Sequence, residues 1–374
     1  MQKRTHFIAL LLVLLLSACA PTWEVELAGP DESIIVDYAR LQELASFAED
    51  EAVPLERVLW ESGYRVIETV TISDADGTQE TFAWPDVAED ATWRFDGEIV
   101  VDGTTFTPAR ITVTPHGDVT QVTAKITDLA PTAAAALGLP APAAATGDVL
   151  TDVDADYVLL LFLDGFGYVR TTEALADGMI PTLAALPEPQ RALTVYPPST
   201  SVASAAILTG AEPKDNGVDR RGIRTTEIET LLDVAAKAGL SVEAVEGNAL
   251  AFNMRNAEIE LSGDKDGNGS TDDNVLTNAL AVLETGMPNL FWVHFHGIDD
   301  AGHTYGPGAP EEAATIREVD AAVGKILDAL PANTLVLIFA DHGMHTVDEG
   351  ERLGNHGNLI ARDMFIPIWT VVTE

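Results

Sequence analysis

The stretch YVLLLFL at residues 157–163 decides the fold, because it is a wholly apolar run that ends abruptly in the polar turn DGFG at 164–167. Similar apolar runs follow at 241–245, 290–295, 334–340 and 365–371. Segments with the apolar spacing of helices separate these runs, which indicates strands of a parallel sheet with helices on both faces. The sequence therefore predicts an α/β domain built on a central, mostly parallel sheet.

Aspartate and histidine side chains follow three of these apolar runs, at the sheet edge where the active sites of such folds lie. With one further histidine in a GNHGN segment, the set is Asp164, Asp299, His303, Asp341, His342 and His356. Each residue alone is ordinary as a turn residue or a buried histidine. Carboxylates gathered at one edge repel one another, however, unless a cation lies among them. Since carboxylate and imidazole ligands suit Zn²⁺, the set predicts two zinc ions about 4 Å apart.

The segment YPPSTS at 196–201 offers hydroxyl groups at the predicted start of a helix over 202–208. Unpaired backbone N–H groups and the positive end of the helix dipole make such a place favourable for a phosphoryl oxyanion. Ser199, Thr200 and Ser201 also suit a simple helix cap, so the spacing alone leaves a nucleophile and a cap equally open.

In chain order, the segments DGFG, YPPSTS with its following LTG, DDAGH, ADHGM and GNHGN resemble the motifs of the alkaline phosphatase superfamily, in particular its bacterial type I phosphodiesterase/nucleotide pyrophosphatase branch. The resemblance covers most of residues 156–371. It implies an alkaline phosphatase-like fold and hydrolysis of phosphate esters, with diesters or nucleotide-like pyrophosphates preferred over monoesters. It also implies that Asp164, Thr200, Asp341 and His342 bind one zinc ion, that Asp299, His303 and His356 bind the other, and that Thr200 is the nucleophile. Mn²⁺ is the alternative metal.

One segment departs from this branch, which carries an asparagine where this chain reads Asp219-Arg220-Arg221. Arg220 and Arg221 suit either a bidentate contact to phosphate or ion pairs with surface acids. His296 adjoins the predicted site and suits either a substrate contact or a packed strand end. The substrate therefore stays open. A phosphomonoesterase or phosphonate hydrolase of the same superfamily is one alternative, and a lipid-anchored binding module with a decayed enzyme domain is another.

Residues 1–18 have the pattern of a lipoprotein signal peptide, with Lys3 and Arg4 before an apolar run and small residues before Cys19. The segment LSAC at 16–19 resembles the bacterial lipobox, which implies a lipid on Cys19, the only cysteine of the chain. We therefore expect export and anchoring to a bacterial membrane, on the periplasmic face of the outer membrane.

The composition restricts the partners. The chain has 59 acidic and 21 basic residues and a formal net charge of −38, so we expect no basic surface that would bind nucleic acid. A small phosphate ester and the membrane that the lipid reaches are the expected partners, and the oligomeric state stays open.

Residues 19–114 consist of short alternating segments separated by turns, and predict a small β-rich α+β accessory module that starts with a helix over 33–47. The catalytic domain is expected over 115–374. Its first part, 115–150, contains TDLAPTA at 127–133, which is similar to a segment that follows the last metal histidine elsewhere in the superfamily. A circular permutation and a linker rich in alanine and proline are both open interpretations.

The loop DKDGNG matches the first half of a calcium-binding loop, with Asp264, Asp266 and Asn268 as candidate ligands. Val275 stands where a glutamate would complete that site. Calcium binding and a simple helix cap at Thr271 both stay open.

Overall fold

The computed structural model describes residues 21–347 and 350–374. The chain divides into two compact units, of which the first ends at Val119 and the second begins at Thr120. The predicted signal peptide and Cys19 lie outside the described residues. Export, lipid attachment and the predicted boundary at 114/115 stay predictions. None of the described helices has the length and apolar character needed to cross a membrane.

The first unit is built from two sheets and short helices, which confirms the predicted β-rich α+β module. Its sheets have the orders β2-β1-β9-β4-β5 and β3-β6-β7-β8. The strands are β1 (Glu24–Ala28), β2 (Ser33–Asp37), β3 (Ala52–Pro54), β4 (Ile67–Asp74), β5 (Gln79–Ala83), β6 (Thr92–Arg94), β7 (Ile99–Val101), β8 (Thr104–Phe106) and β9 (Pro108–Pro115). The α-helices are α2 (Tyr38–Gln42), α3 (Leu55–Glu61) and α4 (Trp84–Val87). Trp84 and Trp93 are fully buried and anchor its core.

The predicted helix over 33–47 is wrong in its first part, which forms strand β2, antiparallel to β1. The β-branched residues at 34–36 favour an extended backbone. The helix begins only at Tyr38, because the Asp37 side chain caps it by accepting a hydrogen bond from the Arg40 backbone N–H at 2.8 Å.

The second unit has an eight-stranded sheet with the order β10-β12-β19-β16-β11-β15-β13-β14. Its strands are β10 (Ala124–Lys125), β11 (Tyr157–Leu163), β12 (Gln190–Leu193), β13 (Val242–Glu246), β14 (Glu258–Leu261), β15 (Leu290–Phe295), β16 (Thr334–Phe339) and β19 (Phe365–Val372). A hairpin of β17 (His345–Thr346) and β18 (Gly354–Asn355) stands apart from it. β11 pairs in parallel with β15 and β16 and is buried from Val158 to Leu163, so the predicted central strand and the mostly parallel α/β sheet are confirmed.

The run predicted at 365–371 is a strand, β19, but it is antiparallel to β12 and β16. Phe339, the last residue of β16, pairs with Ile368 near the start of β19. The connection therefore returns to the sheet at the same end of the strands at which β16 stops. A strand that begins at that end runs antiparallel to β16.

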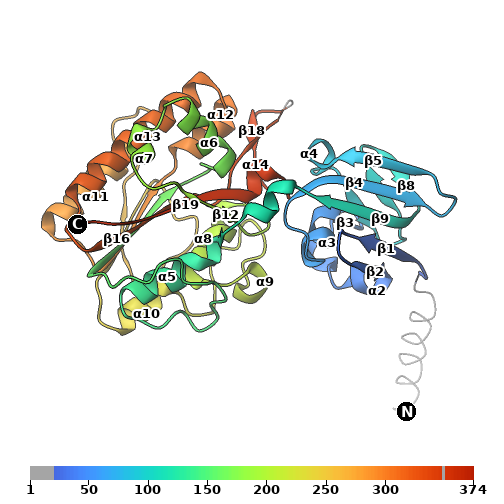
Figure 1. Cartoon of the computed structure of the whole chain (residues 1–374), viewed down its shortest axis with the longest axis horizontal. Helices are drawn as coiled ribbons and strands as arrows, with labels where there is room; N and C mark the ends of the chain where they lie inside the picture. The colour runs from blue at the N-terminus through green and yellow to red at the C-terminus, as the bar shows by residue number, and fades with distance from the viewer. Residues whose placement is uncertain (1–20, 348–349) are drawn as a thin grey trace, which may run out of the picture. The chain divides into compact units, whose positions relative to one another are not determined.

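Helices cover both faces of this sheet, as predicted (Figure 1). Helices α5, α8 and α10 pack together on one side, and α11 and α13 pack together on the other. The α-helices of this unit are α5 (Leu129–Ala136), α6 (Tyr168–Ala176), α7 (Pro181–Ala184), α8 (Thr200–Thr209), α9 (Pro213–Asn216), α10 (Leu231–Lys237), α11 (Asp272–Thr285), α12 (Gly297–Tyr305), α13 (Pro310–Ala329) and α14 (Ala361–Met364). A buried ion pair joins α6 to α13, since Arg170 donates to both carboxylate oxygens of Glu312 at 2.8 and 2.6 Å.

The segment 115–150 contributes to the core of the second unit. Its helix α5 packs against α8 and α10, and Leu129, Ala130 and Ala133 are fully buried. A solvated linker does not fit this packing. The circular permutation stays a prediction.

Candidate active site

The predicted metal ligands meet at the edge of the sheet where β11 and β16 end. Asp164 follows β11 directly, and Asp341 follows β16 after one residue. Helix α12 carries Asp299 and His303 one turn apart, so both side chains lie on one face of it. His356 lies in the loop that follows β18.

The first ligand group consists of Asp164, Asp341 and His342, whose ligand atoms lie within 4.8 Å of one another. His342 Nε2 is 3.1 Å from Asp341 Oδ2 and 3.6 Å from Asp164 Oδ1. The hydroxyl of Thr200, the first residue of α8, lies beside this group. Its Oγ1 atom is 3.5 Å from Asp164 Oδ1 and 3.4 Å from His342 Nε2. A half-buried threonine oxygen is therefore in reach of anything that the group binds.

The second ligand group consists of Asp299, His303 and His356, again with ligand atoms within 4.8 Å of one another. His303 Nε2 is 3.3 Å from Asp299 Oδ2, and His356 Nε2 is 3.7 Å from Asp299 Oδ1. The His356 ring stacks on the ring of His342 with centroids 3.7 Å apart. The two groups are therefore direct neighbours.

All three histidines turn Nε2 toward a carboxylate because a backbone carbonyl holds Nδ1. The Nδ1 atoms of His303, His342 and His356 lie 2.8, 3.0 and 2.8 Å from the carbonyl oxygens of Gly354, Gly343 and Pro198. Since a carbonyl oxygen only accepts, Nδ1 carries the hydrogen and Nε2 keeps its lone pair. Histidines that bind metal ions in proteins are oriented by such a contact.

Two buried carboxylate oxygens, Asp341 Oδ2 and Asp299 Oδ1, have no hydrogen-bond partner among the described residues. Such an atom costs about 1–3 kcal/mol unless something compensates it. Burial, and then the charge of Asp164, raise the pKa of Asp341 well above its usual range. Burial and neighbouring positive charges lower the pKa of His356, so its imidazole is neutral. Carboxylate oxygens without a hydrogen-bond partner beside imidazole Nε2 atoms form a donor set that Zn²⁺ accepts, so these residues fit bound metal ions.

Glycine permits the close packing around these ligands. Gly165 has a φ of +72°, and a Cβ atom on it would lie 2.9 Å from the Cβ of Asp299. A Cβ on Gly343 would overlap the carbonyl oxygen of Arg362. A larger residue at either position would move a ligand.

A pocket of about 360 Å³ opens over the two groups, and Thr200 lies in its wall. Of the residues predicted to contact substrate, Arg221 and His296 line this pocket. Arg221 also donates a hydrogen bond to the His356 carbonyl oxygen at 2.7 Å. Arg220 is not one of the lining residues and contacts Asp219 at 2.9 Å.

Arg224 and Arg352 also line the pocket and were not predicted, nor was Asp300. The sequence held one signal for these arginines: basic residues are rare in this chain, with 21 against 59 acidic ones, so each arginine near the predicted site was a candidate for substrate binding. Three arginines around one pocket of so acidic a chain favour an anionic ligand.

In the predicted calcium loop, the carboxylate oxygens of Asp264 and Asp266 accept hydrogen bonds from backbone N–H groups of the same loop. Asp264 accepts hydrogen bonds from the backbone N–H groups of Gly267 at 2.7 Å and Gly269 at 3.0 Å, and Asp266 accepts one from Asn268 at 3.1 Å. These turns account for the sequence pattern without an ion. Calcium binding stays a prediction.

The chain is similar to one protein family and to parts of several known proteins. Residues 158–369 match the family model described as type I phosphodiesterase / nucleotide pyrophosphatase. The human GPI ethanolamine phosphate transferase 3 catalytic subunit is 30% identical over 88 residues, which are 24% of this chain and 8% of that protein. Human ectonucleotide pyrophosphatase/phosphodiesterase family member 7 is 38% identical over 66 residues, 16% of this chain and 14% of that protein. The chain thus matches well under two thirds of the length of these relatives.

Two solved structures are similar to part of the chain. Phosphonoacetate hydrolase from Sinorhizobium meliloti 1021, in complex with phosphonoacetate, has 16% sequence identity and a TM-score of 0.41, over 53% of this chain and 58% of that one. Murine ectonucleotide pyrophosphatase / phosphodiesterase 5 has 16% identity and a TM-score of 0.41, over 52% of this chain and 58% of that one.

Proposed function

Since the chain belongs to the type I phosphodiesterase / nucleotide pyrophosphatase family, whose model matches more than half of its length, we propose that it is a metal-dependent hydrolase of phosphate esters. The substrate class that we propose is a phosphodiester or a nucleotide-like pyrophosphate. Thr200 is the nucleophile in this proposal, and two zinc ions are the cofactors.

The observation that carries the proposal is the position of the Thr200 hydroxyl, 3.5 and 3.4 Å from Asp164 and His342. Asp164, Asp341 and His342 would hold one ion together with Thr200, and the second ligand group would hold the other. When bound, such ions lower the pKa of a coordinated hydroxyl and neutralise charge on phosphoryl oxygens.

The chain's own groups divide the reaction between them. Thr200 Oγ1 gives its proton to solvent water and attacks phosphorus, so that an Oγ–P bond forms. The bond to the leaving oxygen breaks at the same time, and that oxygen keeps the electron pair and takes a proton from solvent. The N–H groups in the first turn of α8, which begins at Thr200, would favour the negative charge of phosphoryl oxygens bound beside it. Water then attacks the phosphothreonine from the opposite side, which frees the phosphate product and restores the hydroxyl.

The variants Thr200→Ala and Thr200→Ser test this assignment. With bis-p-nitrophenyl phosphate as substrate, we expect Thr200→Ala to lose at least roughly 10³-fold in kcat, because the variant lacks the hydroxyl that forms the covalent intermediate. Thr200→Ser keeps a hydroxyl and should keep measurable turnover. Zinc content, measured by mass spectrometry, should be nearly the same in all three proteins. Unchanged turnover in Thr200→Ala would show that another group is the nucleophile.

Hydrolysis of phosphomonoesters is a second candidate, and the three arginines that line the pocket favour it. A monoester carries one more negative charge than a diester, and arginine binds such a group through charged hydrogen bonds. The ratio of kcat/KM for p-nitrophenyl phosphate to that for the bis ester decides between the two. A ratio above one would favour the monoester.

A further inference from the structure

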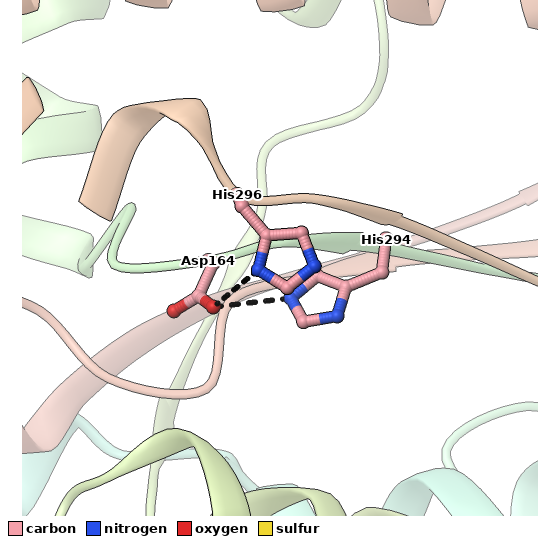
Figure 2. Close-up of side chains that lie close together, drawn as sticks. All are labelled: Asp164, His294 and His296. Atoms are coloured by element: carbon pink, nitrogen blue, oxygen red, sulfur yellow. Dashed lines mark hydrogen bonds and ion pairs between the residues drawn. The ribbon is translucent and has the colours of Figure 1, made fainter. Parts of the chain in front are cut away.

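Two neighbouring histidines, His294 and His296, contact the Asp164 carboxylate oxygen that does not face Thr200. Figure 2 shows the rings of His294 and His296 side by side, each with one nitrogen turned to the Asp164 carboxylate. Asp164 Oδ2 is 3.1 Å from His294 Nε2 and 3.5 Å from His296 Nδ1. These contacts use Oδ2, whereas the contacts to Thr200 and His342 use Oδ1. One carboxylate therefore faces two different sets of groups.

Glu246, at the end of β13, binds the opposite edge of both rings. Its Oε2 atom is 2.9 Å from His294 Nδ1 and 3.1 Å from His296 Nε2. Its Oε1 atom accepts a hydrogen bond from the indole N–H of Trp292 at 2.7 Å. Glu246 and His294 are almost completely buried, whereas the His296 side chain is 20% exposed and lines the active-site pocket.

The number of hydrogen atoms that these contacts require leaves two alternatives, which are two charged rings or a metal ion bound between the rings and Asp164. Every ring nitrogen faces a carboxylate oxygen, which accepts and does not donate. If all four contacts were hydrogen bonds, both rings would be imidazolium ions, with centroids only 3.7 Å apart. A metal ion between Asp164 and the two rings removes this requirement. Each ring is then neutral, binds the ion with one nitrogen and donates its other N–H to Glu246.

The distances also fit an ion. Four ligands at about 2.1 Å in a tetrahedron lie about 3.4 Å from one another. The two separations from Asp164 Oδ2, 3.1 and 3.5 Å, are on either side of that value. A single carboxylate that orients both ligating imidazoles from behind is the usual second partner of metal-bound histidine.

We propose that Asp164, His294 and His296 form a third divalent-cation site, in which Asp164 bridges this ion and the ion of the first ligand group. Its partly exposed side opens to the pocket through His296, so water or a substrate oxygen can take the remaining position. Two imidazoles and one carboxylate favour Zn²⁺ over Mg²⁺, which prefers oxygen ligands. The inference rests on the proposed function to the extent that Asp164 is shared.

The number of ions per chain tests the proposal. The full chain is stripped with EDTA, saturated with ZnCl₂, desalted and analysed by mass spectrometry for zinc and by absorbance for protein. We expect three zinc ions in the wild type and two in His296→Gln, a change at the partly exposed edge of the site. His116→Gln, which removes a histidine of the first unit, is the matched control and should keep three. With MgCl₂ alone, the third site should not fill.

Glu246→Gln gives an independent readout, because Glu246 contacts the two rings at the nitrogens that face away from Asp164. It should weaken the third zinc ion by about 10- to 100-fold and leave the other two unchanged. Anomalous diffraction from zinc-loaded crystals should place a peak between Asp164 Oδ2 and the two rings. Two ions per wild-type chain at saturating zinc, or a His296→Gln protein with the wild-type count, would overturn the proposal.

The two proposals fail separately. If Thr200 is not the nucleophile, Thr200→Ala keeps its turnover whatever the zinc count is. If the third site does not exist, the zinc count is two whatever Thr200→Ala does.

Discussion

Asp341→Asn should change the stability of the protein in opposite directions with and without zinc. Asp341 is fully buried, its Oδ1 atom accepts hydrogen bonds from the N–H groups of Gly165 at 3.1 Å and His342 at 2.9 Å, and its Oδ2 atom has no hydrogen-bond partner in the described part of the chain. Asparagine can keep both bonds through its oxygen. Its new N–H group would face His342 Nε2, which lies 3.1 Å from Oδ2 and has a free lone pair.

The size of the effect follows from this geometry. In EDTA the substitution removes a carboxyl group whose charged form is disfavoured by burial and by Asp164, and it gives the orphaned position a hydrogen bond, a gain of about 1–3 kcal/mol in the free energy of unfolding. For a domain of this size each kcal/mol shifts Tm by about 2–4 °C. With zinc at about 100 times its Kd, each ion that the folded wild type binds contributes about 2.7 kcal/mol, and the variant loses the ion that Asp341 holds.

Differential scanning calorimetry of both proteins, in EDTA and in ZnCl₂, measures the difference in Tm between variant and wild type in each medium. We expect Asp341→Asn to have the higher Tm in EDTA and the lower Tm in zinc. Asp215→Asn, which also removes one acidic charge but at an exposed position, should differ from the wild type by less than about 0.5 kcal/mol in both media. If Asp341→Asn lowers Tm in EDTA, the carboxylate is compensated without a cation, and the reasoning about the first ligand group is refuted.

Three further predictions concern other parts of the second unit. Glu312→Gln should cost about 3 kcal/mol of unfolding free energy, since it removes the buried carboxylate that binds Arg170 and leaves only the 40% exposed Glu173 beside that charge. Glu173→Gln should cost below about 1 kcal/mol in the same urea titration. Arg221→Gln should lower kcat/KM by about 10-fold or more through the loss of a charged hydrogen bond, and equal losses in Arg221→Gln and the control Arg220→Gln would contradict that role. In the metal-free protein, burial alone raises the pKa of Glu246, but the charges and hydrogen bonds of its two histidines lower it to about 2, from 4.5. Its stabilising effect is therefore full above about pH 4.5 and is lost as the pH falls toward 2, so urea midpoints of wild type and Glu246→Gln should converge over that range, and a constant difference would count against it.

The meeting of most candidate metal ligands at one edge was predictable because these residues follow apolar runs, whereas His356 was predicted from the GNHGN segment. Asp164 and Asp341 had to lie at one edge of the sheet once their strands were parallel neighbours, and the four-residue spacing of Asp299 and His303 put both on one face of a helix. These are local patterns combined with one rule of topology. The confirmed α/β class rests on the same reasoning.

The residues that escaped prediction depend on contacts far away in the sequence. Glu246 is one acid among several near the end of its strand, and its role appears only when β15 lies beside β13 and brings His294 to it. Arg224 and Arg352 stand on loops whose course no local pattern determines. The direction of β19 likewise depended on where a 25-residue connection returned to the sheet.

The imidazoles of both ligand groups owe their orientation to main-chain acceptors at Gly354, Gly343 and Pro198. No side-chain substitution removes a main-chain carbonyl oxygen, so a single substitution at Gly354, Gly343 or Pro198 leaves the acceptor that orients each ring in place. A change in the metal affinity of these two groups would therefore require a change of the ligand residues or of the loops that carry the carbonyl groups. The pair behind Asp164 differs, because Glu246 is a side chain that one nucleotide change can remove. Heritable variation in metal loading should therefore concentrate there.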